Sequence, residues 1–139
     1  MRKLAALLAG LVISAGLAFG VSGAGVASAA EPAGELEAEL GPRPWLREGI
    51  VLAAAQTIGV SPETVREALL HGVSLKELGL HHGDGPNELA FGIITHERVI
   101  LDNWVDNGRI TREQAVYGSW FVETHIRLII NEHFEPGRF

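Results

Sequence analysis

The histidines are the residues of this sequence whose side chains could do chemistry. Its 139 residues include six: His71, His81, His82, His96, His125 and His133. Two of them are adjacent in the stretch HHGD at 81–84, and zinc and copper accept imidazole nitrogens and a carboxylate as ligands. His81, His82 and Asp84 therefore form the candidate metal site of the chain. The alternative interpretation, which we favour, is that each histidine is structural or exposed to solvent.

No catalytic motif accompanies these histidines. The sequence has neither the H-E-x-x-H of zinc proteases nor the G-x-S-x-G of serine hydrolases. Cysteine is absent, which excludes disulfides, thiolate zinc sites and cysteine nucleophiles. The stretch DNWVDNGRITREQ (102–114) fails as a calcium loop, because Val105 would take a ligand position and Gln114 the place of the closing glutamate. We therefore expect a non-enzymatic protein without a cofactor.

The N-terminus predicts export. After the basic start MRK, residues 4–30 carry no charge, and ASA at 27–29 is a small-residue cleavage site. We predict a signal peptide at 1–30 that is cleaved near Ala29 or Ala30, and hence a secreted or extracytoplasmic protein. The alternative is an uncleaved membrane anchor, since the run exceeds the ~20 residues that a span needs. Glycines in its second half favour cleavage.

Charge limits the partners of the cleaved chain. Removing residues 1–30 leaves nine basic and seventeen acidic residues, a net charge of −8 with histidine neutral. Such a balance repels nucleic acid and anionic lipid, so we expect no nucleic-acid partner and no stable membrane insertion after cleavage. Residues 31–43, EPAGELEAELGPR, are acidic and contain proline and glycine, which is typical of a flexible spacer.

From residue 44 the pattern becomes helical. Prolines, serines and threonines stand at expected helix starts, glycines at expected ends, and TREQ at 111–114 is a capping box. The expected helices cover residues 44–58, 62–71, 74–79, 86–107 and 112–133. No alternating strand pattern is present. We predict an all-α domain over 44–135, followed by a tail at 136–139. A short, helix-turn-helix-like N-terminal part should pack on a long antiparallel helical hairpin.

The stretch AAAQTIGVSPETVREALLHG (53–72) has the pattern of a helix-turn-helix, with Gly59 at the turn. In such a motif the exposed face of the second helix reads DNA. Here that face carries Glu63, Arg66 and Glu67, so two acids and one base would meet the phosphates. We expect helix-turn-helix geometry without DNA binding, and a DNA-binding regulator is the least favoured function.

The chain resembles small exported bacterial helical proteins of unknown function. The resemblance rests on IGVSPETV (58–65), ALLHGVSLKEL (68–78) and DNWVDNGRITREQA (102–115), and it covers about residues 50–134. These motifs are helix caps and turns, so the resemblance implies an all-helical fold. The ITREQ segment (110–114) is also similar to the L-T-x-x-Q signature of periplasmic stress chaperones and metal-sensing helical proteins.

These observations predict an exported, non-enzymatic domain that acts by contact with another protein or a component of the cell envelope. The alternative is a cell-envelope stress or metal-handling module that binds a divalent metal through the His81-His82 loop. The apolar helical hairpin is also compatible with a homodimer. We expect the three tryptophans, Trp45, Trp104 and Trp120, in the core rather than in a binding patch.

Overall fold

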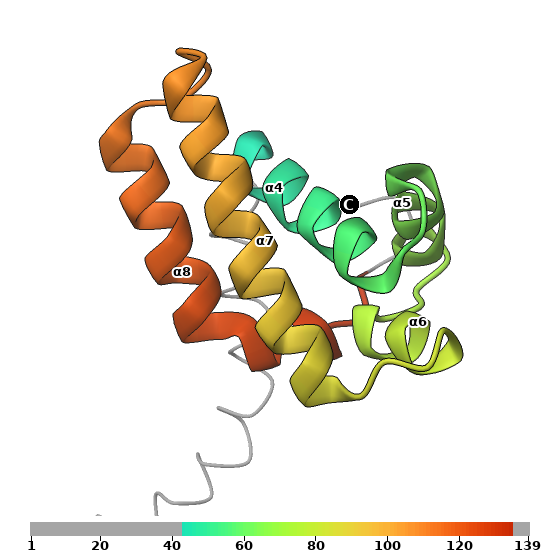
Figure 1. Ribbon diagram of the computed structural model, residues 1–139. Coiled ribbons are helices and arrows are strands. Elements are labelled where there is room, and N and C mark those ends of the chain that lie inside the picture. The colour runs from blue at the N-terminus through green and yellow to red at the C-terminus, as the bar shows by residue number, and fades with distance from the viewer. Residues whose placement is uncertain (1–42, 135–139) are drawn as a thin grey trace, which may run out of the picture. The chain divides into compact units, whose positions relative to one another are not determined.

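All secondary structure in residues 43–134, the part of the chain that the computed structural model describes, is helical. The helices follow in the order α4 (Pro44–Ile58), α5 (Pro62–Leu70), α6 (Leu75–His81), α7 (Pro86–Asp106) and α8 (Arg112–Asn131) (Figure 1). This confirms the predicted all-α fold class. The predicted signal peptide (1–30), the predicted spacer (31–43) except Arg43, residue 135 and the predicted tail (136–139) lie outside the described residues.

Local signals set the starts of these helices. Proline occupies the first turn of α4, α5 and α7, where its missing amide hydrogen leaves no bond unmade. The hydroxyl of Ser61 accepts a hydrogen bond from the amide of Thr64 at 3.1 Å and caps α5. At the start of α8, Thr111 and Gln114 form the predicted capping box, in which each side chain bonds the backbone of the other.

Two of the expected helix ends are wrong. The stretch from residue 80 was expected to be a loop, but α6 continues to His81. The helix passes through Gly79, and the reversal occurs at Gly83, which has a φ of 92°. The amide of Asp84 then donates to the carbonyl of Gly79 at 2.9 Å and closes the turn. At the other end of the domain, α8 ends at Asn131 rather than near residue 133.

The long helices α7 and α8 form the predicted hairpin, and α7 is its central member. Figure 1 shows α7 between α8 on one side and α4 on the other, and α4 makes its most extensive packing against α7. The two shorter helices, α5 and α6, pack beside this layer, with α6 touching α4, α7 and α8. This arrangement confirms a helix-turn-helix-like part packed on a helical hairpin.

Small residues let α4 approach α7 closely. Ala53 and Ala54 are completely buried on α4, and Gly49 lies against Leu101 and Trp104 of α7. Further along α7, a Cβ at Gly92 would overlap the side chain of Thr57. The close packing of these two helices therefore depends on side chains that are short or absent.

The expectation for the tryptophans is wrong at one of three positions. Trp104 is buried and Trp45 is half-buried, but 56% of Trp120 is exposed. The core side of α8 contains Gly118 and Val122. Trp120 lies two residues from each, about 200° around the helix, and so points away from the core.

None of the described helices is long and apolar enough to cross a membrane.

Candidate functional site

The three predicted metal ligands lie at the end of α6 and in the loop that follows. His81 is the last residue of α6, His82 caps it, and their rings meet edge to face with centroids 5.4 Å apart. Both rings are exposed, while Asp84 is half-buried. In the described part of the chain, no three histidine, aspartate or glutamate side chains are grouped so that they could hold a metal ion. Metal binding by His81, His82 and Asp84 thus stays a prediction without geometric support.

Three other histidines bond to the backbone. The Nδ1 atoms of His71 and His125 lie 2.7 and 2.9 Å from the carbonyl oxygens four residues earlier in their own helices. The Nδ1 of His133 lies 2.9 Å from the carbonyl oxygen of Gly72. Since a carbonyl can only accept, each Nδ1 carries a proton and donates it. His133, two residues after the end of α8, thereby ties this part of the chain to the turn before α6.

His96 connects α7 to α4. Its Nδ1 lies 3.1 Å from the hydroxyl of Thr57, and that hydroxyl donates its hydrogen to the carbonyl of Ala53 at 2.8 Å. A hydroxyl has one hydrogen, so His96 must donate to Thr57. These bonds support the structural interpretation for four of the six histidines, since His71, His96, His125 and His133 all have partners in the fold.

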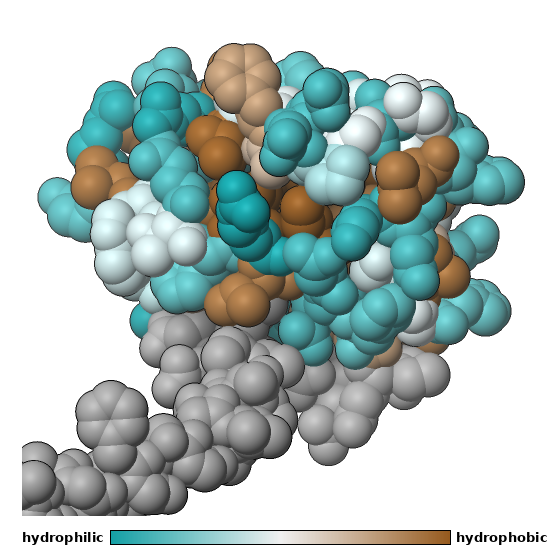
Figure 2. Space-filling model, turned by 90° about the horizontal axis from the view of Figure 1, so that it is seen from below, coloured by the Kyte–Doolittle hydropathy of each residue, from teal (hydrophilic) through white to brown (hydrophobic). Residues whose placement is uncertain are grey.

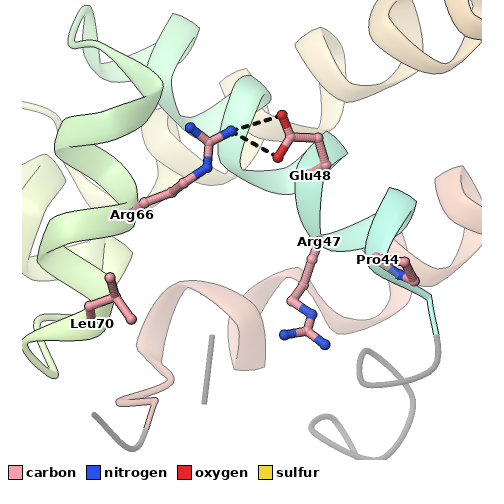
Figure 3. Close-up of a pocket in the computed structure, with 5 residues that line it drawn as sticks. All are labelled: Pro44, Arg47, Glu48, Arg66 and Leu70. Carbon is pink, nitrogen blue, oxygen red and sulfur yellow. Dashed lines mark hydrogen bonds and ion pairs between the residues drawn. The ribbon is translucent and has the colours of Figure 1, made fainter. Parts of the chain in front are cut away.

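A pocket of about 300 Å³ lies between α4 and α5 (Figure 3). It is lined by Pro44, Arg47, Glu48, Arg66 and Leu70. One nitrogen of Arg66 lies 2.8 Å from both carboxylate oxygens of Glu48, and another lies 3.1 Å from Glu63. The basic residue on the outer face of the helix-turn-helix-like pair is therefore neutralised within the chain. Glu63 and Glu67 remain exposed there, which disfavours contact with phosphates.

A carboxyl group is buried between α7 and α8. The side chain of Glu97 is fully buried. Its Oε2 accepts a hydrogen bond from the hydroxyl of Ser119 at 3.4 Å, and its Oε1 has no hydrogen-bond partner among the described residues. Burial raises the pKa of Glu97 to about 7, and the Ser119 bond and the positive charge of Arg98 offset only part of this rise. Gly118 leaves the room for it, since a Cβ there would lie 3.3 Å from Oε1.

Sequence reasoning missed Glu97, although a signal was present. The residue occupies the same helical stripe as the buried residues Ile93, Ile100, Leu101 and Trp104. A glutamate at such a spacing is predicted to face the core. Because Glu97 is buried and one of its oxygens has no hydrogen-bond partner among the described residues, its ionisation lowers the stability of the fold.

A groove of about 340 Å³ runs along the outer side of α7 and α8, above the buried carboxyl group; we call it the α7–α8 groove. Its lining residues are Arg98, Asp102, Arg112, Ala115, Val116, Ser119, Trp120 and Glu123. Ion pairs span it from helix to helix: Arg98 with Glu123, and Arg112 with Asp102 at 3.2 Å. Ser119 both lines the groove and donates to Glu97.

Two apolar side chains stand exposed at this groove. Val116 is 64% exposed and Trp120 is 56% exposed, and they are one turn apart on α8. Figure 2 shows the molecule from below, where hydrophobic side chains appear at separate places on a mostly hydrophilic surface. The α7–α8 groove thus combines exposed apolar side chains with ion pairs that span it.

Comparison with known proteins gives no match among the family models, the curated proteins or the solved structures. The resemblance to small exported helical proteins therefore stays a prediction from the motifs.

Proposed function

We propose that this protein is an exported, non-enzymatic interaction domain that binds a protein or another envelope component through the α7–α8 groove. The observation that carries the proposal is the exposure of Trp120 and Val116 at the edge of that groove. A tryptophan offers a large apolar surface with few rotatable bonds, and it is enriched where binding energy is concentrated.

The charged groups of the groove support this role. Arg112 and Asp102 are both more than 60% exposed, and ion pairs of such exposed groups stabilise a fold by only about 0–1 kcal/mol. Their charges can therefore reorient towards a partner at little cost to the fold. A polar rim around an apolar centre is the usual anatomy of a protein interface.

Photo-crosslinking in the native host tests the proposal. A photoreactive amino acid at position 120 should give a defined adduct, because this side chain would lie inside the contact. The matched control carries the same group in place of Leu80, which is also exposed and apolar but lies on α6. No adduct at position 120, or the same adducts from both positions, would contradict the proposal.

The export part of the proposal has its own measurement. Intact mass of the protein from medium, membrane and cytosol should find a soluble outside species that starts at Ala30 or Glu31. A full-length species in the membrane would instead make residues 4–30 an anchor. A full-length species in the cytosol would contradict export and reopen DNA binding.

A further inference from the structure

We infer that the occupant of the α7–α8 groove is a second copy of this chain, paired through two antiparallel α8 helices. This inference rests on the proposed function and names the partner of the same site. The observation behind it is the order of side chains along the exposed edge of α8. When a second copy runs antiparallel, this order places apolar side chains opposite apolar ones and each charge opposite one of the other sign.

Four residues form this edge, which we call the α8 stripe: Arg112, Val116, Trp120 and Glu123. They follow one another at spacings of three or four residues and therefore lie on one side of the helix. All four line the α7–α8 groove, and Val116 and Trp120 are exposed. Read along the helix, the stripe is positive, apolar, apolar, negative.

A two-fold axis near residue 118 places the α8 stripes of two copies opposite each other in reversed order, so that unlike charges and apolar side chains meet. Two antiparallel helices related by that axis bring Trp120 of each copy level with Val116 of the other. The same axis brings Arg112 of each copy within one residue, about 1.5 Å along the helix, of being level with Glu123 of the other. An interface of this kind uses one patch twice, so the patch must carry both members of each contact. The α8 stripe does so for its apolar pair and for its charged pair.

The net negative charge of the chain favours the α7–α8 groove, whose own charges are balanced, as the place where two copies meet. The net charge is −6 for the full sequence and −8 after the proposed cleavage, so two copies repel each other on average. The groove, by contrast, is lined by two arginines, one aspartate and one glutamate, whose formal charges cancel. The same negative charge disfavours an anionic membrane as the occupant. One helix and its groove form a small contact compared with the ~800 Å² per partner of a standard interface, so we expect a weak dimer.

Sedimentation velocity on the protein purified from its host provides the first test. The dimer fraction of the wild type should rise with concentration. Trp120→Glu should weaken the dimer by at least about tenfold, since it places a charge in the apolar centre. Leu80→Glu is the control, because Leu80 is exposed on α6 and should leave the dimer unchanged. A wild type that stays monomeric at about millimolar concentration contradicts the inference.

A mixing experiment tests the antiparallel register. Arg112→Glu gives a stripe with two negative ends, and Glu123→Arg gives one with two positive ends. Each variant alone should dimerise about tenfold more weakly than the wild type, because like charges then meet. Mixed in equal amounts, they should associate within about threefold of the wild type, because every end again meets its opposite. A mixture no stronger than either variant contradicts the register.

These outcomes separate the inference from the proposed function. A monomeric wild type that still gives an adduct with a different protein at position 120 overturns self-pairing and leaves the interaction domain in place. A monomeric wild type that gives no adduct there overturns both. Thermal melts of all variants should show that each remains folded, as expected for changes at exposed positions.

Discussion

Ser119 of α8 donates a hydrogen bond to the buried carboxyl group of Glu97 on α7, over 3.4 Å. The same serine lines the α7–α8 groove on its outer side. Ser119 thus contacts both a titratable group in the core and the candidate binding surface. Since burial raises the pKa of Glu97 to about 7, the packing of the hairpin is linked to pH in a physiological range.

We expect the contribution of Glu97 to stability to fall as the pH rises. The carboxyl group titrates near 4.5 when unfolded and near 7 in the fold. Below pH 4.5 both states hold the proton, and folding carries no penalty. Between these values the unfolded state gives up its proton first, so the free energy of unfolding decreases and then levels off above about 7. The full loss is about 3 kcal/mol.

Urea unfolding of Glu97→Gln from pH 4 to pH 8 measures this effect. The variant cannot ionise at this position, so its free energy of unfolding should gain on that of the wild type as the pH rises. Glu67→Gln is the control, because Glu67 is exposed on α5, away from the hairpin, and its replacement should give a small difference at every pH. A constant difference between wild type and Glu97→Gln would contradict the raised pKa.

A second prediction concerns the contact between α4 and α7. Gly92→Ala should lower the free energy of unfolding by about 1–3 kcal/mol, because the new methyl group overlaps Thr57. Thr57 cannot rotate freely to make room, since its hydroxyl bonds both His96 and Ala53. Gly49→Ala is the matched control in α4. Its nearest neighbours would lie at 3.7 Å, so the better helix propensity of alanine should stabilise the protein by up to about 1 kcal/mol.

The origin of the Gly92 effect can be checked by a double variant. Thr57→Ala removes the methyl group and the hydroxyl that the new methyl group at position 92 would meet. In that background Gly92→Ala should lose most of its destabilising effect in thermal or urea unfolding. An equal loss of stability in both backgrounds would show that the backbone of α7, and not the clash with Thr57, is responsible.

A third prediction concerns the caps. Ser74→Ala should lower the free energy of unfolding by about 1 kcal/mol. The serine hydroxyl accepts from the amide of Glu77 at 3.2 Å, and the Glu77 carboxylate accepts from the amide of Ser74 at 2.9 Å. Ser74→Thr keeps the hydroxyl and is the control. Hydrogen exchange should show faster opening of α6 in the alanine variant, and equal protection in both variants would contradict the capping role.

The sequence predicted those parts of the fold that short segments determine. Gly59 and Gly108 end helices with φ values of 78° and 70°, as expected. The box of Thr111 and Gln114 begins α8 as expected. Each of these features needs only three or four neighbouring residues. The end of α6 was missed because Gly79 resembles a helix end, whereas the positive φ occurs at Gly83.

The candidate site depends on contacts that no short segment contains. Glu97 meets Ser119 across 22 residues, and Arg66 meets Glu48 across 18. The exposure of Trp120 depends on which side of α8 faces α7, and the type of the residue suggested the core instead. Helical periodicity around Glu97 was the one local signal that pointed towards the hairpin interior.

A last prediction concerns Arg66 and Glu48. Both side chains are about one third exposed, and one nitrogen of Arg66 reaches both carboxylate oxygens at 2.8 Å. Arg66→Lys should therefore lower the free energy of unfolding by less than about 1 kcal/mol, because lysine keeps the charge and loses the planar fork. Arg112→Lys is the control, since its more exposed pair with Asp102 should contribute nothing measurable.

A double-mutant cycle with Glu48→Gln in urea isolates the coupling between Arg66 and Glu48. That coupling should shrink in about 1 M salt, where surface charges are screened within about 3 Å. A coupling unchanged by salt would show that α4 and α5 are held together here by packing, and that the ion pair contributes little.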